Sequence, residues 1–308
     1  MQLALQTMRG YADTLELAHW AEGQKLAAFT VADHYLASAR SSYALDQLTV
    51  MAAIAAETES IELASLVSPI TFRHPAVMLK TAVTIDEISG GRFTLGVGAG
   101  WMKGEHERFG FEFPPIGERF DRLAEALAYL RAGLDGDEAG FEGSHYRLAP
   151  GPAAQPTGAN LRLMVGGSGP KRTPDLAGKF ADEFNLTPAE EPFGLRIERA
   201  RQAAAAAGRD PDALLISTAF PVVVGADEAE IAERIGAVAK RRGVEASEIR
   251  SRWSGVGIPI GTADQYRSRL AEMEEEGIRR VYFQVAFDPI EDVRRAMTLL
   301  GASASRGG

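Results

Sequence analysis

Short apolar runs alternate with longer amphipathic segments along almost the whole chain. The apolar runs have the length of buried strands and fall at residues 2–6, 28–33, 61–67, 92–97, 161–166, 180–185, 214–224 and 279–285. The segments between them carry apolar residues at helical spacing, as Phe120, Leu123, Leu127 and Leu130 do. Strands that alternate with helices are typical of a parallel sheet with helical crossovers.

Each predicted strand is followed by a predicted helix, and eight such units favour an α/β fold, the (βα)8 TIM barrel. The helices are predicted at residues 12–22, 43–58, 74–88, 118–133, 170–178, 190–207, 227–241 and 289–300. Thr262 and Gln265 form a capping box for an additional helix that ends near Gly277. We expect residues 1–301 to form one barrel domain and the small, polar residues 302–308 to form a flexible tail.

Three stretches are longer than a minimal barrel needs: residues 98–117, 134–160 and 242–278. The first follows a strand, so it lies on the face where the active sites of such barrels form. Its glycines and the pair Pro114–Pro115 predict an irregular loop as far as about Glu118. The second contains GFEGSHYRL, which predicts a hairpin.

Charge and composition exclude several classes of protein. The 308 residues carry a formal net charge of −9, which argues against a nucleic-acid partner. The chain has no Cys, which excludes disulfides and thiol chemistry and suits the cytoplasm. No apolar run approaches the ~18 residues of a membrane span, so we expect no membrane association. Because the chain has no Cys, redox chemistry would need a bound cofactor.

A strand that ends in alternating glycines is the most informative feature of the chain. Residues 92–105 read RFTLGVGAGWMKGE, in which Gly96, Gly98 and Gly100 leave one face of the strand without side chains. Such a face would let a flat ligand approach the backbone. The dinucleotide fingerprint does not fit, because no long helix directly follows these glycines. We therefore expect a cofactor site here, with a plain strand end as the alternative.

The second predicted strand ends in a titratable group. It reads FTVADHY and places Asp33, His34 and Tyr35 at the carboxyl end of a barrel strand. His34 is the candidate acid/base, because an imidazole exchanges protons near neutral pH, and Asp33 is expected to orient or charge it. A structural His bonded to the backbone is the alternative. Further on, Arg73 and His74 would either hold a ligand anion or serve as a cap and an ion-pair partner.

The segment LMVGGSGPKRT, residues 163–173, has the form of a phosphate-binding turn between a strand and a helix. We expect Pro170 at the first helical position and free backbone amides beside it. The candidate phosphate-binding residues are Gly166, Gly167, Ser168, Gly169, Lys171, Arg172 and Thr173. An ordinary tight loop is the alternative.

A metal site is not expected, because Glu105, His106 and Glu107 are sequence neighbours that do not converge on one ion, and both glutamates are predicted to be solvated.

These motifs, taken in order, resemble those of the bacterial luciferase-like family of flavin and deazaflavin oxidoreductases. The motifs are VADHY at 31–35, RHPAVMLKTAVTIDEISGGRFTLGVGAGW at 73–101, ERF and LAEAL within 118–127, MVGGSGPKRT at 164–173 and FADEFN at 180–185. The resemblance implies a TIM barrel with a flavin-type ring across its mouth, and a cis peptide at Ser65–Leu66 that supports the ring. Ser65, Leu66 and Gly98 are then cofactor-binding residues, and Tyr35, Trp101 and Glu105 lie on the substrate side. A homodimer is expected by the same analogy.

The resemblance favours the deazaflavin coenzyme F420 as a hydride carrier, with FMN as the alternative cofactor. The sugar-phosphate dehydrogenases of the deazaflavin branch have Trp and Glu where this chain has Ser38 and Trp101. A flatter, less polar substrate is therefore expected. Three functions remain open: an F420-dependent oxidoreductase acting on a small organic molecule, an FMN-dependent monooxygenase served by a partner reductase, and a cofactor-binding protein without catalysis.

Overall fold

The central feature of the fold is a closed ring of parallel strands. The computed structural model describes residues 1–36, 44–136, 139–154 and 161–301. Within them the ring comprises β1 (Gln2–Thr7), β2 (Ala28–Val31), β3 (Glu62–Ser65), β5 (Phe93–Gly98), β8 (Arg162–Gly167), β9 (Glu183–Leu186), β10 (Leu215–Pro221) and β13 (Arg280–Gln284). β1 pairs with both β2 and β13, and β5 pairs with both β3 and β8, which closes the ring. The predicted (βα)8 barrel is confirmed.

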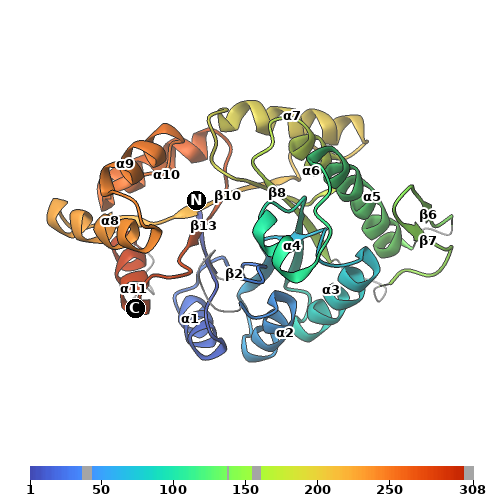
Figure 1. Ribbon diagram of the computed structural model, residues 1–308, viewed down its shortest axis with the longest axis horizontal. Coiled ribbons are helices and arrows are strands. Elements are labelled where there is room, and N and C mark those ends of the chain that lie inside the picture. The colour runs from blue at the N-terminus through green and yellow to red at the C-terminus, as the bar shows by residue number, and fades with distance from the viewer. Residues whose placement is uncertain (37–43, 137–138, 155–160, 302–308) are drawn as a thin grey trace.

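Helices surround this ring (Figure 1). They are α1 (Tyr11–Gly23), α2 (Gln47–Glu57), α3 (Pro75–Ser89), α5 (Ile116–Asp135), α6 (Arg172–Phe180), α7 (Phe193–Ala206), α10 (Ala263–Glu275) and α11 (Ile290–Leu299). The capping box of Thr262 and Gln265 is confirmed and starts α10. Among the described helices, none has the length and apolar character of a membrane span.

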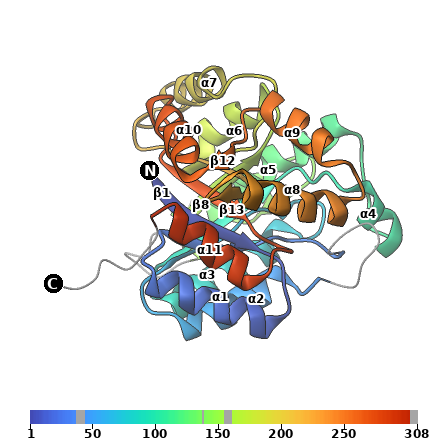
Figure 2. The same ribbon diagram turned by 90° about the vertical axis from the view of Figure 1, so that its left-hand side faces the viewer.

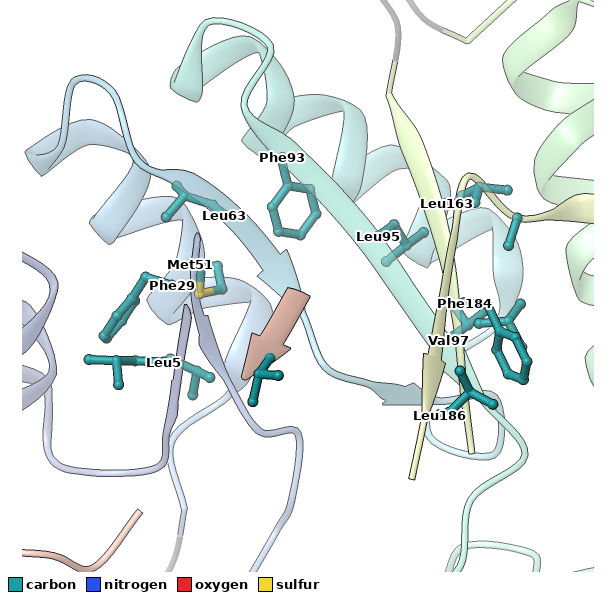
Figure 3. Packing of buried hydrophobic residues seen from close by; sticks show 14 of the residues in the cluster. Leu5, Phe29, Met51, Leu63, Phe93, Leu95, Val97, Leu163, Phe184 and Leu186 are labelled. Atoms are coloured by element: carbon teal, nitrogen blue, oxygen red, sulfur yellow. The ribbon is translucent and has the colours of Figure 1, made fainter. Parts of the chain in front are cut away.

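The strands separate two kinds of side chain. Outward residues such as Leu5, Phe29 and Phe93 are fully buried against the helices (Figure 3). Inward residues form a separate cluster of mostly small side chains, namely Ala4, Ala28, Ala64, Leu66, Met164, Ala219 and Tyr282. The outer layer therefore supplies most of the hydrophobic burial, and the barrel interior is packed rather than open.

Additional elements decorate the barrel. They are α4 (Lys103–Phe109), the hairpin of β6 (Phe141–Glu142) and β7 (Arg147–Leu148), α8 (Glu228–Arg242), α9 (Ala246–Gly255), and the pair β11 (Val223–Gly225) and β12 (Ile260–Thr262). The hairpin expected within residues 134–160 is confirmed. Figure 2 shows α4 on the side of the barrel opposite Met1, where the ring strands end.

Several local predictions were wrong. The loop expected after β5 contains α4, which ends at Gly110 with a positive φ of 73°. The helix after the glycine turn begins at Arg172, so Pro170 precedes it instead of occupying its first position. The predicted strand 214–224 is divided into β10 and β11. Ser38 and the expected tail of residues 302–308 lie outside the described residues.

Candidate functional site

A buried carboxylate holds the imidazole at the end of β2. His34 Nδ1 lies 3.0 Å from Glu105 Oε2, and the other carboxylate oxygen accepts the backbone N–H groups of Tyr35 at 2.7 Å and Leu36 at 2.9 Å. Glu105 is only 1% exposed, whereas the His34 side chain is 18% exposed. A carboxylate can only accept at Nδ1, so this contact favours Nδ1–H and leaves Nε2 to exchange a proton.

The Glu105 carboxylate is stabilised in its charged form. Burial alone would raise its pKa, but the hydrogen bonds from His34 and from the Leu36 and Tyr35 amides prevail and hold the pKa below its usual value. The prediction that Glu105 is a solvated loop charge was wrong, because α4 turns it inward beneath the end of β2. Glu107, on the same helix, is exposed and pairs with Lys103 at 2.9 Å, as expected of a surface charge.

Asp33 does not orient His34, contrary to prediction. Its carboxylate binds the Arg73 guanidinium through both oxygens, and Arg73 also binds Asp46. Burial raises the pKa of Asp33. Burial alone would lower the pKa of Arg73, but the two carboxylates raise it. Of the two roles considered for Arg73, ion pairing is therefore the one observed, and His74 caps α3 by accepting the Ala76 N–H at 3.1 Å.

The glycine face of β5 is covered by a neighbouring segment of the chain. The Ser65 hydroxyl accepts the Gly96 N–H at 2.7 Å and donates to the Gly96 carbonyl at 2.9 Å. A Cβ atom added to Gly98 would lie 2.8 Å from Val67 Cγ2, and one added to Gly166 would lie 2.7 Å from Val67 Cγ1. The prediction that a ligand meets these glycines directly was wrong, because Val67 fills the space beside them.

Val67 belongs to a bulge between β3 and β4 (Ser68–Pro69). Both of these strands pair with β5, so the intervening residues project inward at the mouth of the barrel. The bulge contains a non-proline cis peptide at Leu66–Val67, one bond beyond the predicted Ser65–Leu66. Ser65 is fully buried and its hydroxyl is bonded to Gly96, so it anchors the bulge to β5.

The glycine turn after β8 presents backbone donors and a few side chains. Arg172 and Thr173 open α6, and within the described residues their backbone N–H groups have no hydrogen-bond acceptor. Ser168 and Lys171 are exposed beside them, and Thr173 is buried against Gly169. These donors have the arrangement that an anion site at a helix N-terminus requires.

Arg172 departs from the predicted phosphate-binding set. Its guanidinium donates to Asp121 at 2.6 Å and to the Gly117 carbonyl at 3.0 Å, and it lies over the Phe120 ring. These three partners draw the side chain onto α5. The Arg172 side chain therefore links α6 to α5, and only the backbone N–H of Arg172 remains as a donor at the glycine turn.

The two aromatic residues expected on the substrate side have different surroundings. The Trp101 side chain is 70% exposed, and its ring centroid lies 5.7 Å from that of His34 in an edge-on arrangement of 85°. The Tyr35 ring packs within a cluster formed by Phe72, Phe109 and Phe111, at centroid distances of 4.9 to 5.1 Å. Trp101 faces the open side of His34, whereas Tyr35 secures α4.

Comparison with known proteins gives this arrangement a family. The model of the luciferase-like monooxygenase family matches residues 2–280. The chain belongs to this family. It is 28% identical over 316 residues to the F420-dependent glucose-6-phosphate dehydrogenase of Nocardia farcinica, covering 94% of this chain and 92% of that protein.

Solved structures of other proteins share the fold. An F420-dependent secondary alcohol dehydrogenase, in complex with an F420–acetone adduct, superposes with a TM-score of 0.79 at 19% identity over 99% of both chains. Monooxygenase RslO1 from Streptomyces bottropensis superposes with a TM-score of 0.80 at 21% identity over 98% of both chains. At these identities the similarity establishes the fold.

Sequence reasoning missed a pair of amides inside this luciferase-like barrel. Gln6 and Gln284 are register partners on β1 and β13, and Gln284 Nε2 donates to Gln6 Oε1 at 2.8 Å. Gln6 Nε2 in turn donates to the Leu66 carbonyl of the bulge. The available signal was a polar residue at the last inward position of two apolar strands.

Among the described residues, no group of three or more His, Asp or Glu side chains is placed to hold a metal ion.

Proposed function

We propose that this protein is an F420-dependent oxidoreductase that transfers a hydride between the deazaflavin and a small organic substrate, with His34 as the acid/base. The family membership and the F420-dependent relatives support the reaction class and the cofactor. The single observation that carries the acid/base assignment is the bond from His34 Nδ1 to buried Glu105. When bound, the deazaflavin supplies a ring carbon that accepts or donates hydride.

The residues present fit such a group. The bulge of Leu66 and Val67 is anchored by Ser65, and the lack of a Cβ on Gly98 lets Val67 pack against β5, so the bulge would offer a platform for the ring at the barrel mouth. The turn that follows Gly166 and Gly167 at the end of β8 would offer donors for a phosphate from Ser168, Gly169, Lys171, Thr173 and the backbone of Arg172. Ring and phosphate would thus be held on the C-terminal face of the barrel.

His34 would manage the proton that accompanies hydride transfer. Because Glu105 engages Nδ1, the imidazole rotates little and Nε2 is the atom left to accept or return a proton. Partial burial limits access of water to the ring. Asp33, assigned with His34 to the catalytic pair, would act at a distance by holding Arg73 and hence the segment that follows β3.

An FMN-dependent monooxygenase served by a partner reductase is the second candidate. The family's description as monooxygenases favours it. The two rings share their shape and their phosphate requirement, so the residues named above would serve either cofactor.

Parallel titration of the purified protein with F420 and with FMN tests the proposal. We expect quenching of cofactor fluorescence with micromolar dissociation for F420 and much weaker binding of FMN. The reverse order, together with oxygen consumption during turnover, would favour the monooxygenase. Tight binding of neither would contradict both assignments. If His34→Ala altered neither binding nor any turnover, the protein would be a non-catalytic cofactor binder.

We further propose that residues 1–301 act as one domain within a cytoplasmic homodimer. The absence of Cys suits a reducing compartment. Dimer formation is proposed from the family resemblance, and the molar mass in solution, measured by light scattering, tests it.

A further inference from the structure

We propose that the substrate is an uncharged, largely apolar molecule that binds against Trp101 and carries neither a phosphate nor a carboxylate group. This inference rests on the proposed function, because it concerns the same face of the barrel. It separates this protein from the relative in Nocardia farcinica, whose name specifies a phosphorylated sugar.

Trp101 gives the site an apolar wall. It is 70% exposed, more than the other large hydrophobic side chains of the described residues, and its ring meets His34 edge-on. The loop that carries it is held in place, because Arg119 donates to the Gly100 carbonyl and also lies over the Phe113 ring. An indole fixed in this way beside an acid/base group gains free energy when an apolar surface covers it.

Other exposed apolar side chains occupy the same end of the barrel. Tyr11 opens α1 after β1, Leu45 precedes α2 after β2, and Phe287 follows β13; they are 40%, 44% and 51% exposed. β13, β1 and β2 are neighbours in the ring, so the loops that follow them emerge side by side. His34 follows β2 on this same side. These apolar residues therefore lie on the same face of the barrel as Trp101.

Three of the described arginines at this end are engaged by internal partners. Arg9 donates to the carbonyls of Val285 and Asp288, Arg73 binds Asp33 and Asp46, and Arg119 donates to the carbonyls of Gly100 and Pro114. A substrate anion that engaged any of these three arginines would have to displace an internal partner, at the cost of leaving an acceptor unpaired. Lys171, which is exposed, lies in the glycine turn assigned to the cofactor phosphate.

Carboxylates add a repulsive contribution. Glu190 and Glu191 follow β9, so two acidic residues stand on a loop of the same face, whereas Asp288 after β13 is paired with Arg241. The chain as a whole carries a formal net charge of −9. Like charges disfavour the approach of a phosphorylated or carboxylated substrate and leave neutral molecules unaffected.

A binding experiment on the cofactor-free protein tests this inference. The probe is prodan, an uncharged naphthyl ketone whose emission shifts to the blue in apolar surroundings. We expect Trp101→Ala to weaken prodan binding by about fivefold or more, because the indole supplies much of the contact area. Ile88→Ala is the matched control, since Ile88 is 45% exposed at the far end of α3. Unchanged prodan affinity in Trp101→Ala would overturn the inference.

Competition and turnover address the charge of the substrate. Glucose 6-phosphate and inorganic phosphate should leave bound prodan in place, whereas cyclohexanol should displace it. With F420 present, cyclohexanol or cyclohexanone should be turned over with a higher kcat/KM than glucose 6-phosphate. Displacement of prodan by phosphate, or faster turnover of the phosphorylated sugar, would refute the inference. If the unmodified protein did not bind F420, the proposed function would be refuted, and the prodan result would stand independently.

Discussion

Glu105 accepts the hydrogen bond of His34 Nδ1 from a position 71 residues further along the chain. The same carboxylate accepts two backbone N–H groups of the segment that follows His34, so one side chain sets both the imidazole and the loop that carries it. Glu105 therefore positions the His34 imidazole, and comparison with the surface residue Glu107 separates this role from that of a surface charge.

Replacing Glu105 by Gln should lower kcat by about 10- to 1,000-fold, because the amide no longer stabilises the charged imidazole that forms when Nε2 takes up a proton. The dissociation constant for F420 should change by less than about threefold, since the cradle is untouched. Steady-state kinetics and F420 titration measure the two effects. Glu107→Gln is the matched control and should behave as the unmodified protein does. Equal activity of the two variants would contradict the positioning role.

The pH dependence of stability should carry the signature of Glu105. Its pKa in the folded protein lies below the ordinary value of 4.5, so its contribution to the free energy of unfolding is present above pH 4.5 and is lost as the pH falls through the folded value. Urea unfolding from pH 7 down to pH 3 should therefore show a difference between the unmodified protein and Glu105→Gln that shrinks at acidic pH. A difference that grew on acidification would mean that the pKa is raised instead.

Gln284 should act on cofactor binding through Gln6. Gln6→Leu should weaken F420 binding by about tenfold, because the Leu66 carbonyl of the platform loses its donor. Gln284→Leu should have a smaller effect, and the double variant should match Gln6→Leu alone.

The exposed Gln202, which pairs with Glu198 on the surface of α7, provides the control Gln202→Leu. Strictly additive effects of the two inward replacements would show that Gln284 acts independently of Gln6.

Gly98→Ala should lower the free energy of unfolding by about 1 to 3 kcal/mol, because the new methyl group would lie 2.8 Å from Val67 Cγ2. Val67→Ala in the same chain should recover part of this loss by removing the colliding methyl group. Gly104→Ala should be neutral or slightly stabilising, since Gly104 lies in α4 with no atom within 4 Å of an added Cβ. Denaturant unfolding of the four proteins tests this, and failure of Val67→Ala to compensate would exclude the proposed contact.

Much of the architecture follows from local patterns. The order of strands and helices, the capping box at Thr262 and the hairpin at residues 141–148 depend on neighbours within a few residues, and the sequence predicts them. His34 could be placed at the carboxyl end of a strand for the same reason. The motifs around residues 73–101 and 164–173 also indicated the family that the comparison identified.

The partners of these residues depend on contacts that local patterns do not specify. Asp33 is adjacent to His34 in sequence, yet successive residues at a strand end point in different directions, and Asp33 meets Arg73 instead. The formation of α4, which the glycines and prolines of residues 98–117 argued against, rotates Glu105 inward to meet His34. Val67 likewise fills the face of Gly98 from another strand.

By itself, the sequence determined the barrel, its family and the position of His34, because periodicity, capping and motif order are short-range properties of the chain. Only the tertiary structure decided that Glu105 orients His34, that Val67 covers the glycines and that Arg172 turns toward α5. The physical reason is the same in each case. A side chain selects its partner by the free energy of burying and pairing it among segments that folding brings together, and those segments are far apart in the sequence.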